Sequence, residues 1–305
     1  MTWLKKMFVD ENRRKSDTHF PFFILCISII DVALLIYTIV NNNGIAPMSE
    51  NPMAGASSLT LIRNGAKFVP CMKSTQNNFV SYTVNCTSIS SITNTTCTYE
   101  QYLWYVCNVK NLKGFPYQAY RFFVPIFLHG GIIHLILNLF GQLCLGTEFE
   151  RKFGSIRVFI IYILSGIGGV LLSAVGLPTY PGVGASGALM GIIAVHIIDI
   201  IRCWNDLPNH WTEIIMNGIS ALVSLIIGIF VPMIDYMAHL GGFIVGILSG
   251  LLLCPNLYWQ IRDDWTAVKS RLIIMIISSV LLLAFFLGGF IGFFQTTAPV
   301  VYIAN

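Results

Sequence analysis

The chain has 305 residues, of which 55% are hydrophobic and only 10% are charged, and its mean hydropathy is +0.72. This composition excludes a soluble globular protein, and a formal net charge of +4 is too small to indicate nucleic-acid binding. Apolar runs of about 20 residues, the length of a membrane-spanning helix, recur along the chain, and the alternating pattern of a membrane barrel is absent. The sequence therefore predicts an all-α polytopic membrane protein in contact with the lipid bilayer.

Seven segments are predicted to span the membrane: residues 21–40, 131–146, 158–177, 186–201, 214–231, 236–253 and 272–294. They imply an N-terminal tail over 1–20 and a six-helix core over 21–253, which includes a long loop over 41–123. A linker over 254–271 and an extra C-terminal helix with a tail over 272–305 complete the chain. Residues 148–157 are expected to form a compact charged loop, and the short connections that follow predict a bundle of antiparallel neighbours.

Basic residues are distributed unevenly between the predicted loops. They precede the first span, separate the second from the third, follow the fourth and precede the seventh (Lys5, Lys6, Arg13, Arg14, Lys15, Arg151, Lys152, Arg157, Arg202, Arg262, Lys269, Arg271). This bias predicts a cytosolic N-terminus and linker, and an exoplasmic long loop and C-terminal tail. The first span lacks a small-residue cleavage pattern and the tail contains acidic residues, so neither a cleaved signal peptide nor a mitochondrial transit peptide is predicted.

The long loop has the features of an oxidising compartment. Its four cysteines, Cys71, Cys86, Cys97 and Cys107, predict two disulfides, for which three pairings are possible. It also contains two N-glycosylation sequons, at Asn85 and Asn94. The expected location is therefore the plasma membrane or another secretory-pathway membrane.

One acidic residue, Asp31, lies near the middle of the first predicted span. An acid at this depth is either functional or hydrogen-bonded to a neighbouring helix, and the second interpretation is favoured because the sequence offers no obvious ionisable partner. A transporter with Asp31 in its path is a weaker alternative, since no inverted repeat is visible.

Two polar residues are predicted to share one face of the second span. Pro125 and the Gly130-Gly131 pair indicate that the regular helix begins near Gly131. His134 and Asn138 are four residues apart, so they lie one above the other in its exoplasmic half. Such groups in an apolar helix require partners or a polar cavity.

Small residues recur at every fourth position in the sixth span: Ala238, Gly242, Gly246 and Gly250. Gly187 and Gly191 show the same spacing in the fourth span. Such stripes allow two helices to pack closely in lipid, so the fourth and sixth helices are expected to pack backbone to backbone.

Ser186 and His239 each border one of these stripes, a short way below the same membrane face. Tight packing is expected to bring the Ser186 hydroxyl within ~3 Å of an imidazole nitrogen, the distance that a general base requires. The backbone N–H of Ser186, His134 and Asn138 are candidate donors to the oxyanion of a tetrahedral intermediate. A serine at a tight helix crossing is by itself usually a packing residue; its combination with His239, His134 and Asn138 indicates a hydrolase.

The motifs that contain these residues resemble those of the rhomboid intramembrane serine proteases. They are GASG around Ser186, AHLGG around His239, FLHGGIIHLILNLFG over 127–141, and Glu150 followed by Gly154 and Arg157. The resemblance implies a Ser186–His239 dyad without a third acid, an oxyanion pair of His134 and Asn138, transmembrane proteins as substrates, and neither metal nor cofactor. It also implies structural support from His129, Gly184, Gly187, Gly242, Gly246, Glu150 and Arg121. The extra C-terminal helix resembles the eukaryotic secretory-pathway form.

Two positions depart from that family's pattern. Tyr120-Arg121 stands where a Trp-Arg pair is usual, and Met190 stands where many members have an aromatic ring that packs on the catalytic histidine. These departures leave open an alternative, a catalytically inactive rhomboid-like protein that binds and retains membrane clients.

The remaining candidate side chains are expected to be structural. Asp235 is interpreted as a helix-start acid rather than the third member of a triad. His196 is predicted to lie too deep to share the site, and His210 to lie in a solvated loop. A zinc protease is not indicated, because the sequence contains no His-Glu-x-x-His motif.

Overall fold

The computed structural model describes residues 19–74, 83–86, 96–109, 117–202, 204–205, 207–231, 234–254 and 265–300. Most of the predicted N-terminal tail, the sequon at Asn94 and most of the predicted linker lie outside these residues. Within them, six helices are long and apolar enough to cross a membrane: α2 (Phe22–Asn41), a continuous helix over Ile132–Phe153, α7 (Ser155–Gly176), α9 (His210–Phe230), α10 (Tyr236–Leu253) and α11 (Trp265–Gln295). α8 (Ser186–Arg202) has 17 residues and is the fourth predicted span. The structure confirms the predicted all-α polytopic fold.

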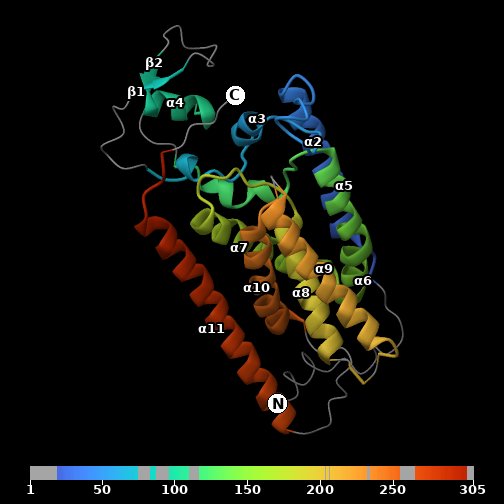
Figure 1. Cartoon of the computed structure of the whole chain (residues 1–305). Helices are drawn as coiled ribbons and strands as arrows, with labels where there is room; N and C mark the ends of the chain where they lie inside the picture. Colours follow the sequence, from blue (N-terminus) through green and yellow to red (C-terminus); the bar gives the residue numbers. More distant parts are fainter. Residues whose placement is uncertain are drawn as a thin grey trace.

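Helix α10 lies at the centre of the bundle, where it packs mainly against α7 and α8 (Figure 1). A Cβ atom added to Gly242 would lie 1.9 Å from the Gly187 carbonyl oxygen, and one added to Gly246 would lie 2.4 Å from the Gly191 Cα atom. The backbones of α8 and α10 are therefore in direct contact, which confirms the packing expected from their small residues. This contact brings together the helices that begin near Ser186 and His239.

The predicted charged loop over 148–157 is wrong. The second membrane helix does not end at Gly146 but runs through α5 (Ile132–Gly141), a π-helical turn η5 (Gln142–Gly146) and α6 (Thr147–Phe153). The chain then reverses at Gly154, whose φ of +81° lies in the left-handed region that favours glycine, and α7 begins at once. The charged residues belong to the end of α6 and the start of α7, because a single glycine is enough to make the turn.

The long loop contains several short elements above one end of the bundle (Figure 1). They are α3 (Ser58–Arg63), the 3-10 turn η1 (Val69–Cys71), β1 (Thr83–Asn85), β2 (Thr96–Thr98), α4 (Tyr99–Val106), and the 3-10 turns η3 (Ala119–Phe122) and η4 (Val124–Ile126). Strands β1 and β2 are antiparallel, with Val84 opposite Cys97. The disulfides join Cys71 to Cys107 and Cys86 to Cys97, so one of the three possible pairings is formed.

The buried acid Asp31 has a hydrogen-bond partner on the second membrane helix. The Gln142 side-chain amide donates to Asp31 Oδ2 at 2.8 Å, and it also lies 2.8 Å from the Tyr162 hydroxyl of α7. Asp31 therefore hydrogen-bonds a neighbouring helix, as the favoured interpretation of the sequence expected.

Candidate active site

The long loop holds the start of α5 in place. The first N–H groups of a helix have no partner within the helix, and here those of Ile132 and Ile133 donate to the backbone carbonyls of Ala54 and Met53. The buried Asn51 side chain donates to the Gly130 carbonyl at 2.6 Å. These contacts fix the backbone one turn before His134. Asn51 was not singled out in the sequence, because a lone asparagine in a polar loop gives no signal of its own.

His134 and Gly184 form one side of the site. The Gly130 N–H lies 3.3 Å from His134 Nδ1, so Nδ1 accepts that hydrogen bond and Nε2 holds the proton of the neutral ring. Gly184 has a φ of +126°, and a Cβ atom added there would lie 2.9 Å from His134 Nε2 and 3.6 Å from Ser186 Oγ. The donor at Nε2 and the serine hydroxyl therefore border the same space, which a side chain at position 184 would fill.

Asn138 lies one turn further along α5 and is also buried. Its side-chain amide donates to the His134 carbonyl oxygen at 3.1 Å. His134 and Asn138 therefore share one face of α5, as predicted. The Asn138 amide donates to the backbone of its own helix. The side-chain amide has two N–H groups, and this hydrogen bond uses one of them.

Ser186 and His239 are in hydrogen-bond contact. His239 Nε2 lies 2.8 Å from Ser186 Oγ, and His239 Nδ1 lies 2.9 Å from the Ser224 backbone carbonyl oxygen. A carbonyl oxygen only accepts, so Nδ1 carries the proton and Nε2 is left to accept from the serine hydroxyl. The Ser224 carbonyl was not predicted from the sequence, because every residue has a backbone carbonyl and a sequence pattern cannot single one out.

The backbone N–H of Ser186 is suited to receive negative charge. Ser186 is the first residue of α8, so its N–H has no acceptor within the helix, and the helix dipole favours an anion at this end. Together with the Nε2–H of His134, it offers donors beside the hydroxyl that would attack a carbonyl.

Asp235 is the N-terminal cap of α10. Its Oδ1 atom accepts from the Ala238 N–H at 3.0 Å, and its backbone carbonyl accepts from the His239 N–H at 3.1 Å. The structure thus confirms the interpretation of Asp235 as a helix-start acid.

Two of the predicted supporting residues, Arg121 and Glu150, lie away from the dyad. Arg121 is fully buried, and its Nη1 atom donates to the carbonyls of Ile62 and Ala66 within the long loop. The Glu150 carboxylate accepts from the N–H groups of Phe23 and Ile24 at the start of α2, both at 2.8 Å. These two residues therefore stabilise the loop and the α2–α6 contact, away from the dyad.

His129 is fully buried beside His134, with the two ring centres 5.5 Å apart. Burial lowers the pKa of His129 to about 3, the neighbouring His134 lowers it further, and the Phe127 backbone carbonyl opposes the shift. His129 is therefore a neutral ring that packs against the side of His134.

Met190 and the remaining histidines lie outside the Ser186–His239 contact. Met190 packs in a small apolar cluster with Ile193, Ala221 and Phe243. His196 lies beside the Leu145 carbonyl and the Phe149 ring, deeper in the bundle, as predicted. His210 is the first residue of α9 rather than part of a loop, and its ring packs against Trp204. Among the described residues, no cluster of three histidines, cysteines or acids is arranged to hold a metal ion.

Comparison with known proteins gives consistent matches over the helical core. The rhomboid domain model matches residues 116–256, which include the predicted dyad and the predicted oxyanion pair. Rhomboid-type serine protease 2 of Emericella nidulans is 34% identical over 227 residues, which cover 68% of this chain and 43% of that protein. RHOMBOID-like protein 4 of Arabidopsis thaliana is 29% identical over 300 residues, 90% of this chain and 66% of that protein.

A third relative differs in its described activity. Inactive rhomboid protein 1 of Danio rerio is 33% identical over 181 residues, 58% of this chain and 20% of that protein. The chain thus spans less than half the length of two of these three relatives. The match to the rhomboid domain model and the 34% identity to a rhomboid-type serine protease over 68% of this chain show that the chain belongs to the rhomboid family.

Proposed function

We propose that the chain is an intramembrane serine endopeptidase in which Ser186 is the nucleophile and His239 is the general base. The observation that carries this proposal is the 2.8 Å contact between His239 Nε2 and Ser186 Oγ. The Ser224 carbonyl supports it, because it holds the imidazole in the tautomer that accepts a proton at Nε2.

The proposed reaction follows from these positions. Ser186 Oγ attacks the scissile carbonyl carbon while its proton passes to His239 Nε2. The tetrahedral oxyanion accepts hydrogen bonds from the Ser186 N–H and from His134 Nε2–H. As the intermediate collapses, the imidazolium gives its proton to the leaving amine and Ser186 keeps the acyl group. Water, deprotonated by the same imidazole, then hydrolyses the ester.

The proposed substrates are single-span membrane proteins, cut in or near the exoplasmic end of their transmembrane helix. A helix shields its carbonyls and satisfies its amides, so attack requires local unwinding, and helix-breaking or small residues near the scissile bond are preferred. This assignment assumes a cytosolic N-terminus and a plasma-membrane or other secretory-pathway location. By resemblance to the family, substrates approach beside α9.

The test is co-expression of candidate single-span substrates with the wild-type protein, Ser186→Ala or His239→Ala. Cleavage is expected with the wild type and absent with both variants, at equal expression and equal melting temperature in detergent. Undiminished cleavage by Ser186→Ala would sink the proposal.

A second candidate is a rhomboid-like protein that binds and retains membrane clients without cutting them. Two observations favour it: Met190 replaces the usual aromatic ring, and one relative is described as an inactive rhomboid. Labelling of Ser186 by a fluorophosphonate distinguishes the two candidates. Labelling that is lost on His239→Ala supports the enzyme, whereas unlabelled wild type with client retention unchanged by Ser186→Ala supports the binder.

A further inference from the structure

Two lysines of the long loop, Lys67 and Lys73, are buried against the bundle, and they contact different parts of it. Lys67 is only 1% exposed; its Nζ atom donates to the Leu177 carbonyl at 2.9 Å and lies 3.6 Å from Asp235 Oδ2. A lysine is rarely buried to this extent without a partner for its charge. Asp235 supplies that partner.

Asp235 connects this lysine to the helix that carries His239. Its Oδ1 atom caps the start of α10 through the Ala238 N–H, and its Oδ2 atom accepts from the Ser173 hydroxyl of α7. Its backbone carbonyl accepts from the His239 N–H itself. A displacement of Asp235 would therefore move the first turn of α10, and His239 with it.

The backbone of Lys67 connects to the segment that leads to Ser186. The Lys67 N–H donates to the Gly182 carbonyl and the Gly182 N–H donates to the Lys67 carbonyl, both at 2.9 Å. Gly182 lies four residues before Ser186, and a Cβ atom added to it would lie 2.8 Å from Asp235 Oδ2 and 2.8 Å from Lys67 Cε. The Lys67–Asp235 ion pair therefore packs directly against the backbone at Gly182, and there is no room for a side chain at that position.

We propose that Lys67 and Asp235 are positioning residues that hold Ser186 and His239 in register with each other. Lys67 acts on both sides of the dyad: its backbone holds the chain before the nucleophile, and its ammonium holds the cap of the helix that carries the base. The inference rests on the proposed protease function for its kinetic consequences, and its structural part is testable without substrate.

The pair also predicts a dependence on pH. Burial lowers the pKa of Lys67 to about 8, and the charge of Asp235 opposes this shift. Two further titratable groups interact with Asp235: Tyr180, whose pKa is raised to about 12 by burial and then by Asp235, and His239 of α10. Above about pH 8 Lys67 loses its charge, so the attraction between its ammonium and the Asp235 carboxyl group is lost, and the register of the dyad is expected to loosen.

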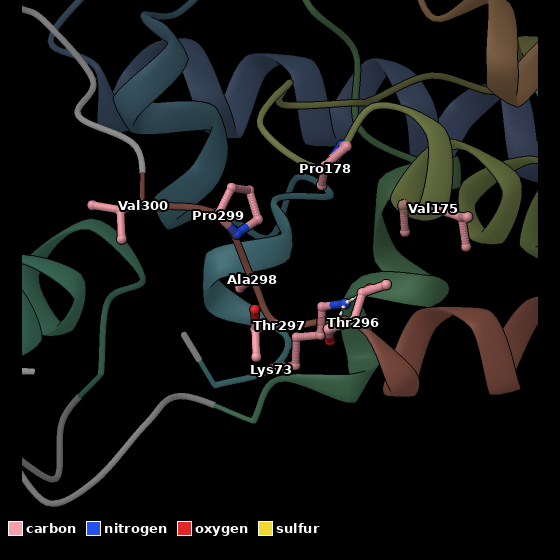
Figure 2. Close-up of a pocket in the computed structure, with 9 residues that line it drawn as sticks. Lys73, Val175, Pro178, Thr296, Thr297, Ala298, Pro299 and Val300 are labelled. Atoms are coloured by element: carbon pink, nitrogen blue, oxygen red, sulfur yellow. Dashed lines mark hydrogen bonds between the residues drawn. The ribbon is translucent and has the colours of Figure 1, made fainter. Parts of the chain in front are cut away.

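Lys73 offers a matched control. Its Nζ atom donates to the Phe293 carbonyl at 2.5 Å and to the Thr296 carbonyl at 2.8 Å, so it holds the end of α11 (Figure 2). Figure 2 shows Lys73 beside Thr296, with Pro178 and Pro299 nearby. These residues line a cavity of about 410 Å³. Lys67→Met and Lys73→Met thus remove the same buried charge from the same loop, but only the first touches the helix of the base.

The kinetic arm measures fluorophosphonate labelling of Ser186, kcat and KM across neutral and alkaline pH in the full-length protein. Lys67→Met is expected to lower the labelling rate and kcat by about tenfold with KM unchanged, and to abolish the decline above about pH 8. Lys67→Arg is expected to restore the neutral-pH rate and to move the decline to higher pH. In a double variant with Asp235→Asn the loss is expected to be smaller than the sum of the two single losses, because the two residues share one contact.

The structural arm uses nitrogen-15 NMR of the histidine rings in the Ser186→Ala background. Lys67→Met is expected to shift the His239 resonance, identified by its loss in His239→Gln, and Lys73→Met is expected to leave it in place. If the wild type is neither labelled nor active but this difference is seen, the protease proposal fails and the positioning inference stands. An unshifted His239 resonance in Lys67→Met, or equal kinetic losses in the two lysine variants, would overturn the inference.

Discussion

The Nδ1 atom of His239 on α10 lies 2.9 Å from the backbone carbonyl oxygen of Ser224 on α9. In a catalytic triad an acid at this position holds the imidazole tautomer; here a carbonyl of a neighbouring helix is placed to do so. The geometry of the dyad therefore depends on how closely α9 approaches α10.

Gly228 controls that approach, and its replacement by alanine is expected to lower kcat. A Cβ atom at position 228 would lie 2.9 Å from Tyr236 Cβ and 3.0 Å from the Tyr236 backbone, which cannot yield easily. α9 would move away, and with it the Ser224 carbonyl, so a loss of about tenfold in kcat is expected from the misplaced base. Gly218→Ala in the same helix is the control, because nothing lies within 4 Å of its added methyl. Equal activity of the two variants would show that the α9 contact does not orient His239.

Because of His129, the free energy of unfolding is expected to fall at acidic pH. Its pKa is lowered to about 3 from 6.5, so between these values the unfolded chain binds a proton that the folded protein does not. The stabilising contribution is therefore complete above pH 6.5 and is lost progressively as the pH falls toward about 3, at up to about 1.4 kcal/mol per pH unit. Melting temperatures measured from neutral to mildly acidic pH should fall less steeply for His129→Gln than for the wild type. Equal slopes of melting temperature against pH in the two proteins would mean that protonation of His129 does not destabilise the folded protein.

Glu150 stabilises the start of α2 rather than the chemistry. Both carboxylate oxygens of Glu150 accept hydrogen bonds, from the N–H groups of Phe23 and Ile24 and from the Ser155 hydroxyl. Glu150→Gln replaces one of these oxygens by an NH2 group, so that a donor would face a donor. The expected cost is about 1–3 kcal/mol of unfolding free energy, with unchanged kcat per folded molecule. Thermal unfolding in detergent measures the first and active-site titration the second. Glu148→Gln, an exposed neighbour in α6, should leave both unchanged.

The two disulfides are expected to differ in importance. Cys71–Cys107 closes a separation of 36 residues and is buried beside the Arg121 contacts, whereas Cys86–Cys97 closes 11 residues in the β1–β2 hairpin. The loop-closure model assigns about 4 kcal/mol to the first and about 3 kcal/mol to the second. The serine pair at Cys71 and Cys107 should therefore lower the melting temperature further and also reduce Ser186 labelling. A larger effect from the Cys86–Cys97 pair would reverse this order.

Several features could be predicted from the sequence because their causes are local. Apolar runs define the membrane helices, and the predicted bounds of 236–253 agree with those of α10. The small residues Gly187, Gly191, Gly242 and Gly246 predicted the contact of α8 with α10, since a helix displays every fourth residue on one face. The position of the turn at Gly154 was missed because charged residues suit a helix end as well as a loop.

The sequence by itself determined the fold class and the helices that pack together, and it indicated the side chains that are proposed to cut a peptide bond. Only the tertiary structure decided the disulfide pairing, the Ser224 carbonyl at His239, the loop carbonyls that cap α5, and the Lys67–Asp235 contact. Each of these joins atoms from segments far apart in the chain, and two of them involve backbone groups that every residue possesses. Periodicity and residue type carry no information about such contacts, because their formation depends on distances that exist only once the helices have packed.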